Sequence, residues 1–365
     1  MLSNIRSSRL PIAALLFLAA CHNPASPFLS GHAENLTDFG ERLETLRGRL
    51  DIPGMSVGIA EGNRIVWTRG MGSADISRNI AATPTTGFHI ASLTKGFAAI
   101  LLVRLVSEGK VSLDDPVTKF GVTIPGDPGI KVRHLANMTS EGTPGRSFSY
   151  NGDRYGLLGQ VIASASGKTF GELVVQQILK PFSLTRTAPN LRSPAFDASG
   201  LDRAAFTANL ATGYQGSGSS ISAVTYPDYF GPAAGIISTA EDMLNYSIAI
   251  DGGSLVTAAE RSMMFEAAKS TSGTTLPYAI GWFSQTINGV AIEWAYGYWV
   301  GNSSLIIRVP SKQRTFVALA NSDGLSAGFT LGSGDLLSSS VAREFLEAFV
   351  FGDTPLTSVT TSGMQ

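Results

Sequence analysis

Residues 88–95 read FHIASLTK, and residues 96–103 continue as GFAAILLV. Ser92 and Lys95 are three residues apart, so a helix that begins here places them one turn apart on the same face. The residues that follow are apolar on every side until Arg104, which is typical of a helix buried in the middle of a protein. The stretch therefore predicts a buried helix with a serine and a lysine in its first turn.

A lysine in such a position has unusual acid–base chemistry. Burial disfavours the ammonium form, which lowers the pKa of Lys95 from about 10.4 and allows the amine to accept a proton. The positive end of the helix dipole favours negative charge on the oxygen of Ser92. Both effects activate a serine nucleophile. The same spacing recurs at Ser107 and Lys110, where Gly109 instead predicts the end of a helix.

Composition excludes several classes of protein. The chain has 365 residues, of which 15% are charged and 44% hydrophobic, so a large core is possible and disorder is not expected. The net charge is −1 with no basic run, so no nucleic-acid partner is predicted. The four histidines lack metal-ligand spacing, so no metal or cofactor is expected, and His89 is interpreted as structural.

The N-terminal 21 residues have the pattern of a targeting segment. Two arginines precede an apolar run that is too short to span a bilayer, and the run ends in LAAC at residues 18–21. This ending resembles the lipobox of bacterial lipoproteins, in which Cys21 becomes the lipidated first residue. The alternatives are an ordinary secretory signal or a free thiol. Residues 22–34 are predicted to be a tether, and His22 favours the periplasmic face of the outer membrane in the bacterial cell envelope.

Periodicity predicts strands near both ends of the chain and helices between them. Helices are expected at residues 36–50, 132–137, 154–166, 171–179, 239–250, 257–269 and 336–349. Strands are expected at residues 55–60, 64–69, 278–286, 290–294, 302–309 and 315–321. Residues 193–232 show little periodicity and are predicted to be a long surface excursion that lines a cleft.

This order predicts an α+β fold, in which one antiparallel sheet is shared by the two ends and flanked by helices, with an inserted all-α domain. The sheet domain is assigned to residues 35–110 and 235–350, and the helical domain to residues 111–234. Residues 351–365 are expected to form a loose tail. A cleft between the two domains would contain Ser92, because domain interfaces are favoured binding sites.

Several motifs in fixed order resemble the serine β-lactamase and penicillin-binding-protein superfamily. They are FxIASxTK at 88–95, VxLDDP at 111–116, IxVRHL at 130–135, FxY at 148–150, AGIISTxEDM at 234–243, and Gly297 with GxSS at 301–304. The pattern is most similar to the class C-like branch, which includes family VIII esterases and D-amino-acid-specific peptidases. The resemblance covers roughly residues 35–350 and implies a β-lactamase/transpeptidase-like fold.

The resemblance implies roles for individual residues. Ser92 is the nucleophile, Lys95 assists in removing its proton, and Tyr150 is the general base or proton shuttle. The backbone N–H groups of Ser92 and Tyr298 form the oxyanion hole.

Two of the motifs depart from the family pattern. Gly152 stands where the second motif, Tyr-x-Asn, has an asparagine that holds the lysine and the substrate carbonyl. Asn151 and Asp153 are the neighbouring residues that remain as substitutes.

The third motif reads Ala295-Tyr296-Gly297 and lacks the usual polar or cationic side chain at its first position. Together with Gly152, these three residues are predicted to contact substrate, with Gly297 keeping the strand edge open. The missing cation argues against efficient β-lactam hydrolysis, because that group would bind the carboxylate of the drug. Trp294 would replace it only if the strand bulged.

The function implied is that of an exported, lipid-anchored serine hydrolase that acts through an acyl-enzyme on esters or on D-amino-acid-containing peptides or amides. One alternative is a β-lactamase or a penicillin-sensitive D,D-carboxypeptidase. Another is a weakly active or non-catalytic protein that binds cell-wall fragments or a protein partner, since a fold does not guarantee chemistry.

Overall fold

A seven-stranded antiparallel sheet forms the centre of the computed structural model, which describes residues 33–126, 129–352 and 354–357. In order across the sheet, the strands are β3 (Ile80–Ala81), β2 (Arg64–Asp75), β1 (Gly54–Glu61), β12 (Arg314–Ala320), β11 (Asn302–Val309), β10 (Val290–Trp299) and β9 (Phe283–Ile287). The first and last strands of the chain therefore pair at the middle of the sheet, with Val57 opposite Ala318. The predicted sheet shared by the two ends is confirmed.

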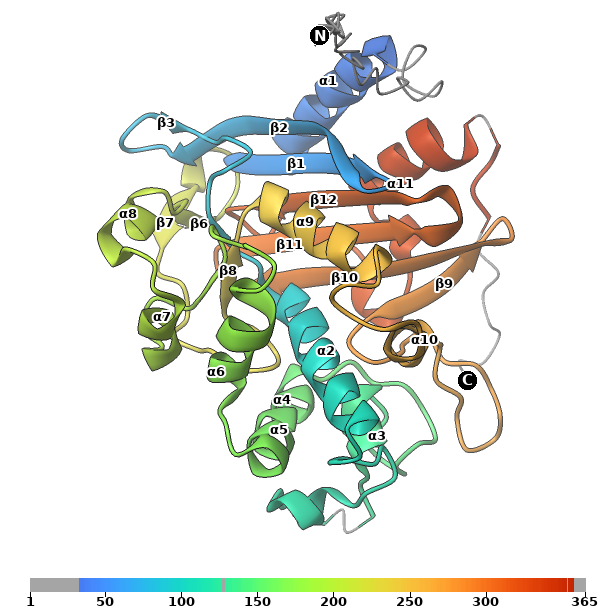
Figure 1. Ribbon diagram of the computed structural model, residues 1–365. Helices are drawn as coiled ribbons and strands as arrows, with labels where there is room; N and C mark the ends of the chain where they lie inside the picture. Colours follow the sequence, from blue (N-terminus) through green and yellow to red (C-terminus); the bar gives the residue numbers. More distant parts are fainter. Residues whose placement is uncertain (1–32, 127–128, 353, 358–365) are drawn as a thin grey trace, which may run out of the picture.

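Helices cover both faces of this sheet (Figure 1). α9 (Ala240–Asp251) lies on one face, where the hydroxyls of Ser247 and Thr315 are 2.8 Å apart. α1 (Ala33–Arg49) and α11 (Ser340–Leu346) lie on the other face. There Phe316 contacts Phe39 and Phe345, at ring-centroid distances of 5.9 and 5.0 Å. The neighbours Thr315 and Phe316 thus face opposite layers, as alternation along a strand requires.

In the view of Figure 1, the remaining elements lie to the left of the sheet and below its β9–β10 side. The α-helices among them are α2 (Thr94–Ser107), α3 (Val132–Ala136), α4 (Gly152–Gly156), α5 (Leu158–Ser166), α6 (Phe170–Val174), α7 (Pro194–Ser199), α8 (Arg203–Ala208) and α10 (Ala258–Phe265). A three-stranded sheet of β4 (Phe88–His89), β8 (Ile236–Ser238) and β5 (Ala188–Pro189), and a pair of β6 (Gly213–Gln215) and β7 (Ser222–Val224), complete the fold. α2 extends from the sheet towards α5 and α6.

The segment 111–234 differs in detail from the all-helical insertion that was predicted. It also carries the short strands β5, β6 and β7, and β5 pairs with β8 outside the segment. Residues 193–232, predicted to be a long surface excursion with little periodicity, contain α7, α8, a 3-10 turn at Gly218–Ser220 and the β6–β7 pair. These elements are only two to six residues long, which is too short to produce a periodic sequence signal.

Several element boundaries also differ. The strands expected at 64–69 and 290–294 extend to Asp75 and Trp299, and the helices expected at 171–179 and 336–349 are each divided into shorter helical segments. Three further differences have a local reason. The helix expected at 154–166 is split into α4 and α5, and α4 begins earlier because Asn151 caps it by accepting a hydrogen bond from the Arg154 N–H at 2.9 Å. The helix expected at 257–269 ends at Phe265, because Glu266 is extended. The strand expected at 278–286 begins only at Phe283, because Gly281 turns the chain with a φ of +78°.

The chain ends bear on three further predictions. The signal segment, Cys21 and residues 22–32 of the tether lie outside the described residues, and the last two tether residues already belong to α1. Residues 354–357 of the predicted loose tail are held by Asn288 in the β9–β10 hairpin, whose amide donates to the Pro355 carbonyl at 2.9 Å. The Thr357 N–H donates to the Asn288 side chain at 3.0 Å.

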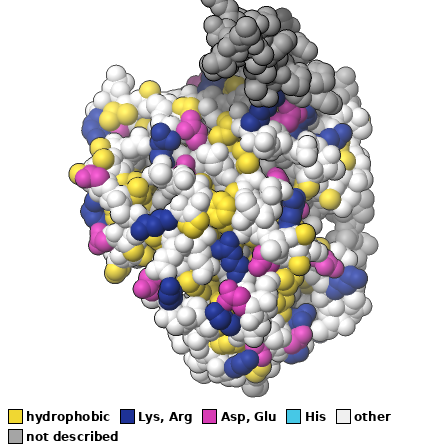
Figure 2. Space-filling view, in the orientation of Figure 1, with side chains coloured by type: hydrophobic (Ala, Val, Ile, Leu, Met, Phe, Trp, Pro, Cys, Tyr) yellow, Lys and Arg dark blue, Asp and Glu magenta, His cyan; other side chains and the backbone are white. Residues whose placement is uncertain are grey.

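The surface shown in Figure 2 carries basic and acidic side chains interspersed, without a region of a single sign. Within the described ranges, no helix is both long and apolar enough to cross a bilayer. The same residues contain no group of three or more histidine, cysteine or acidic side chains that would hold a metal ion.

Candidate active site

Ser92 lies on a short 3-10 turn, Ala91–Leu93, that joins β4 to α2. The turn is held from two sides, since the Ile90 N–H donates to the Ile236 carbonyl at 3.0 Å and Ser304 Oγ donates to the Ile90 carbonyl at 2.8 Å. Ala91 has a φ of +44°, a region that residues with a side chain rarely adopt. This constrained backbone directly precedes Ser92 and fixes where its side chain points.

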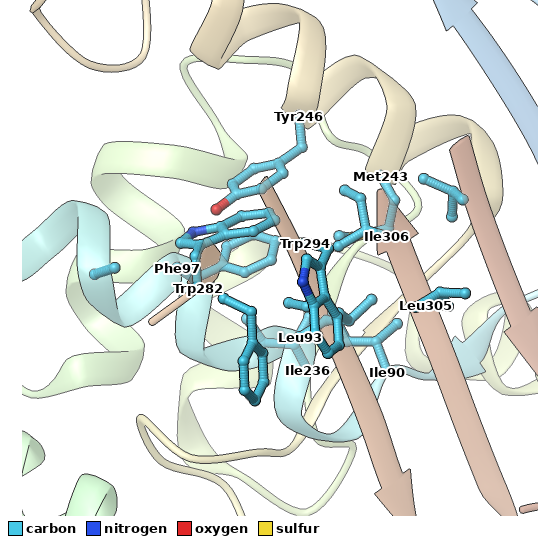
Figure 3. Packing of buried hydrophobic residues seen from close by; sticks show 14 of the residues in the cluster. Ile90, Leu93, Phe97, Ile236, Met243, Tyr246, Trp282, Trp294, Leu305 and Ile306 are labelled. Carbon is cyan, nitrogen blue, oxygen red and sulfur yellow. The ribbon is translucent and has the colours of Figure 1, made fainter. Parts of the chain in front are cut away.

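The helix behind Ser92 is buried as predicted. Figure 3 shows Ile90, Leu93 and Phe97 packed among aromatic and aliphatic side chains from the sheet and from α9. Phe97 stacks on Tyr246 with ring centroids 4.4 Å apart. Lys95, in the first turn of α2, is 1% exposed. The rigid apolar surroundings therefore hold a lysine amine out of water.

The amine of Lys95 points at the serine. Lys95 Nζ donates a hydrogen bond to Ser92 Oγ at 2.7 Å and another to the main-chain carbonyl of Ala233 at 2.9 Å. Burial lowers the pKa of Lys95 to about 7, and the negative charge of Asp153 partly opposes this shift. A substantial fraction of Lys95 is therefore neutral near pH 7 and able to accept a proton from Ser92.

Tyr150 completes this group of side chains. Its ring centroid lies 5.1 Å from Lys95 Nζ. Burial raises the pKa of Tyr150 well above 10, the nearby Tyr296 raises it further, and the neighbouring Ser92 side chain works in the opposite direction. Tyr150 therefore stays protonated and is suited to relay a proton between groups rather than to act as a standing phenolate.

An open strand edge lies against the Ser92 turn. β10 pairs with β9 only as far as Trp294, so residues 295–299 pair with β11 alone. A Cβ at Gly297 would lie 2.5 Å from the Ile90 carbonyl oxygen and 2.2 Å from Ser304 Oγ. Only glycine allows the strand to approach the turn so closely. The arrangement brings the backbone of Tyr298, the next residue, to the same edge.

The third motif is arranged differently from its sequence pattern. β10 and β11 pair in continuous register, so no bulge brings Trp294 into the site, and Trp294 is fully buried. The side chain of Ala295 is also buried, at 6% exposure. The side chain of Tyr296 faces Tyr150 instead, with ring centroids 5.4 Å apart.

The second motif leaves a space. A Cβ at Gly152 would have Lys95 Nζ, at 4.0 Å, as its one neighbour within 4 Å. Asn151 does not replace the missing amide, because its side chain caps α4 and donates to Glu141 at 2.6 Å. Asp153 is exposed and influences Lys95 through its charge.

The residues interpreted as structural behave accordingly. His89 is buried and lies against Tyr226 with ring centroids 3.8 Å apart, and burial lowers its pKa to about 3, so it stays neutral. The second Ser-x-x-Lys pattern lies at the end of α2, where Gly109 has a φ of +68° and Lys110 pairs with Glu108 at 2.7 Å.

One contribution to the site was not found from the sequence. The carbonyl of Ala233 that accepts a hydrogen bond from Lys95 belongs to the main chain, so the type of residue at this position gives no signal of it. Ala233 lies in the segment that precedes β8, next to the motif at 234–243.

Comparison with known proteins gives the family. The family model described as Beta-lactamase matches residues 39–333, which is most of the chain, and the chain belongs to this family. Protein flp of Staphylococcus aureus strain MRSA252 is 25% identical over 313 residues, covering 74% of this chain and 60% of flp. The chain thus spans less than two thirds of the length of this relative. The mouse protein named serine beta-lactamase-like protein LACTB, mitochondrial, is 30% identical over 99 residues, or 27% of this chain and 18% of LACTB.

Solved structures show the same fold. The octameric penicillin-binding protein homologue from Pyrococcus abyssi superposes with a TM-score of 0.69 at 22% identity, covering 79% of this chain and 74% of that one. A structure titled SurE gives a TM-score of 0.67 at 20% identity, covering 87% and 75%. The predicted superfamily and its mixed fold, an antiparallel sheet flanked by helices, are confirmed.

Proposed function

We propose that the protein is a serine hydrolase that forms an acyl-enzyme on Ser92. The observation that carries this proposal is the buried amine of Lys95, hydrogen-bonded to Ser92 Oγ at 2.7 Å with a pKa of about 7. A serine hydroxyl and an amine within hydrogen-bond reach, with the amine able to accept a proton, are what nucleophilic acyl transfer requires. Tyr150, whose ring centroid lies 5.1 Å from Lys95 Nζ, offers a second route for the proton.

The proposed reaction is acyl transfer in two steps. Ser92 Oγ attacks the substrate carbonyl carbon while its proton passes to Lys95, directly or through Tyr150. The carbonyl oxygen becomes an oxyanion, which the N–H groups of Ser92 and Tyr298 stabilise. The bond to the leaving group breaks, and the leaving oxygen or nitrogen takes the proton through Tyr150. Water then attacks the acyl-enzyme. Its proton passes through Lys95 or Tyr150 to Ser92 Oγ, which releases the acid and free Ser92.

Esters, or D-amino-acid-containing peptides and amides, are the proposed substrates. Penicillins fit less well, because the buried methyl group of Ala295 supplies no cation for a carboxylate and Gly152 supplies no amide. We further propose that the protein is exported and held at a membrane surface by a lipid on Cys21, on the basis of the LAAC ending at residues 18–21. Replacing Cys21 with alanine would then release the protein from the membrane fraction.

The proposed activity is tested with residues 22–365 as a soluble protein, a short-chain nitrophenyl ester and, separately, a penicillin. Nitrophenol release by the wild type that is lost in Ser92→Ala supports the serine hydrolase. A long-lived penicillin adduct on Ser92 without ester turnover favours a penicillin-binding role instead. Absence of both turnover and adduct contradicts the proposed function for these substrate classes.

A further inference from the structure

Three glycines follow one another along α4 and the start of α5, and they face the segment that holds Lys95. A Cβ at Gly156 would lie 3.1 Å from the Tyr229 hydroxyl, and one at Gly159 would lie 3.2 Å from Pro232. These two glycines are therefore explained by close packing, since a larger residue would push the segment away. Gly152 is one turn before Gly156 on the same face, and packing does not explain it.

Gly152 has room for a side chain. A Cβ there would meet only Lys95 Nζ, at the ordinary contact distance of 4.0 Å, whereas nearly every other glycine in the interior meets an atom at less than 3.4 Å. The backbone gives no reason for glycine either, because Gly152 has no positive φ and begins a helix, where glycine is a poor residue. The missing side chain leaves a space open beside the amine that activates Ser92.

The groups around this space restrict what enters it. Lys95 Nζ lies 5.1 Å from the ring centroid of Tyr150 and donates hydrogen bonds to Ser92 and to the Ala233 carbonyl. No other atom lies within 4 Å of the added Cβ, so a charged substituent would lose its hydration without a polar group dedicated to it. An apolar substituent has no such cost and would lie near the ring of Tyr150.

We propose that Gly152 determines specificity, and that the space beside Lys95 receives a bulky, uncharged substituent on the carbon next to the scissile carbonyl. The reacting carbonyl carbon must lie at Ser92 Oγ. Lys95 Nζ is 2.7 Å from that oxygen and 4.0 Å from a Cβ at Gly152, so the substituents of the carbonyl are the parts of the substrate nearest to the space. The inference rests on the proposed serine hydrolase and names its substrate class as neutral esters with branched acyl groups.

The experiment compares p-nitrophenyl pivalate, whose acyl carbon carries three methyl groups, with p-nitrophenyl acetate. Gly152→Ala and Gly152→Val fill the space without adding a polar atom. Gly48→Val is the matched control, because a Cβ at Gly48 in α1 would meet nothing within 4 Å. Circular dichroism and thermal unfolding establish that each variant is folded.

We expect Gly152→Val to lower the ratio of kcat/KM for pivalate to that for acetate about tenfold or more, with Gly152→Ala between it and the wild type and Gly48→Val unchanged. An unchanged ratio in folded Gly152→Val overturns the inference while acetate turnover preserves the proposed function. A Gly152→Val variant that instead changes its preference among acetate esters of different alcohols also overturns the inference, because the space would then receive the leaving group. The proposed function is unaffected by that result. Wild-type protein that hydrolyses neither ester overturns the proposed function, and the inference with it.

Discussion

Lys95 Nζ lies 2.7 Å from Ser92 Oγ inside a core that leaves the lysine 1% exposed. The distance allows direct proton transfer between the two side chains. Burial makes the amine available as a base, because its pKa is lowered to about 7 and it loses its own proton near neutrality. One turn of helix supplies both partners, so their geometry depends on few other parts of the chain.

The first prediction concerns pH. Acylation requires neutral Lys95, so kcat/KM for a nitrophenyl ester should rise with pH and reach half its maximum near pH 7. Asp153 raises the pKa of Lys95, so Asp153→Asn should move the midpoint to lower pH. Asp38→Asn, at an exposed position in α1, should leave it in place. A midpoint that moves upward in Asp153→Asn contradicts this assignment.

The same pKa predicts a change in stability. The folded-state pKa of Lys95 lies below the ordinary lysine value of 10.5, so folding is penalised below pH 7, and the penalty is relieved as pH rises from about 7 towards 10.5. Lys95→Met removes the penalty. The melting temperature of the variant minus that of the wild type should therefore be most positive below pH 7 and decrease with rising pH. A difference that is independent of pH between 6 and 10 would argue that Lys95 titrates normally.

Tyr150→Phe removes the hydroxyl that is proposed to relay the proton and keeps the ring, which stacks at 5.9 Å on Phe283. We expect kcat to fall about 10²–10⁴-fold with little change in melting temperature. Tyr278→Phe is the matched control, because Tyr278 belongs to the same aromatic cluster and contacts Phe283 at 4.7 Å. Equal losses in the two variants would mean that the cluster, and not the Tyr150 hydroxyl, matters.

Gly297→Val tests the close approach of β10 to the Ser92 turn. The new side chain would overlap Ser304 Oγ and the Ile90 carbonyl, and relieving the overlap displaces the strand or the turn. We expect the free energy of unfolding to fall by about 1–3 kcal/mol and ester turnover to fall as well. Ala291→Val, at an exposed position of the same strand, should change neither. Full activity in Gly297→Val would show that the strand edge is not part of the site.

Much of the site was predictable because its chemistry is local. Ser92 and Lys95 are positioned by one helical turn, and the apolar residues that follow them in the sequence predict that the helix is buried. The strands from both ends were recognisable because alternation and the Asn288-Gly289 turn are strong signals, and both residues have the positive φ that such a turn needs.

What was not predictable depends on the tertiary arrangement. The Ala233 carbonyl approaches Lys95 from 138 residues away through a main-chain atom. The sequence likewise identified the first position of the third motif but not that the Ala295 side chain would be buried, because the local course of an open strand edge decides which side chain faces Tyr150.

The burial of the Ala295 side chain leads to a further prediction. Introducing lysine there does not restore a penicillin site, because the side chain begins in the core beside the buried Ile306. We expect Ala295→Lys to lower the free energy of unfolding by about 2 kcal/mol or more without conferring penicillin hydrolysis. Ala291→Lys, exposed on the same strand, should be tolerated. A stable Ala295→Lys variant that hydrolyses penicillin would refute this interpretation.

The most direct test of the central claim is to find the acyl group. Protein mixed with a p-nitrophenyl ester, quenched in acid within the first turnover and digested should carry the acyl group on Ser92, at about one equivalent of the nitrophenol released in the burst. Ser92→Ala should show neither the burst nor the adduct. An acyl group on a different residue, or a burst that persists in Ser92→Ala, would contradict Ser92 as the nucleophile.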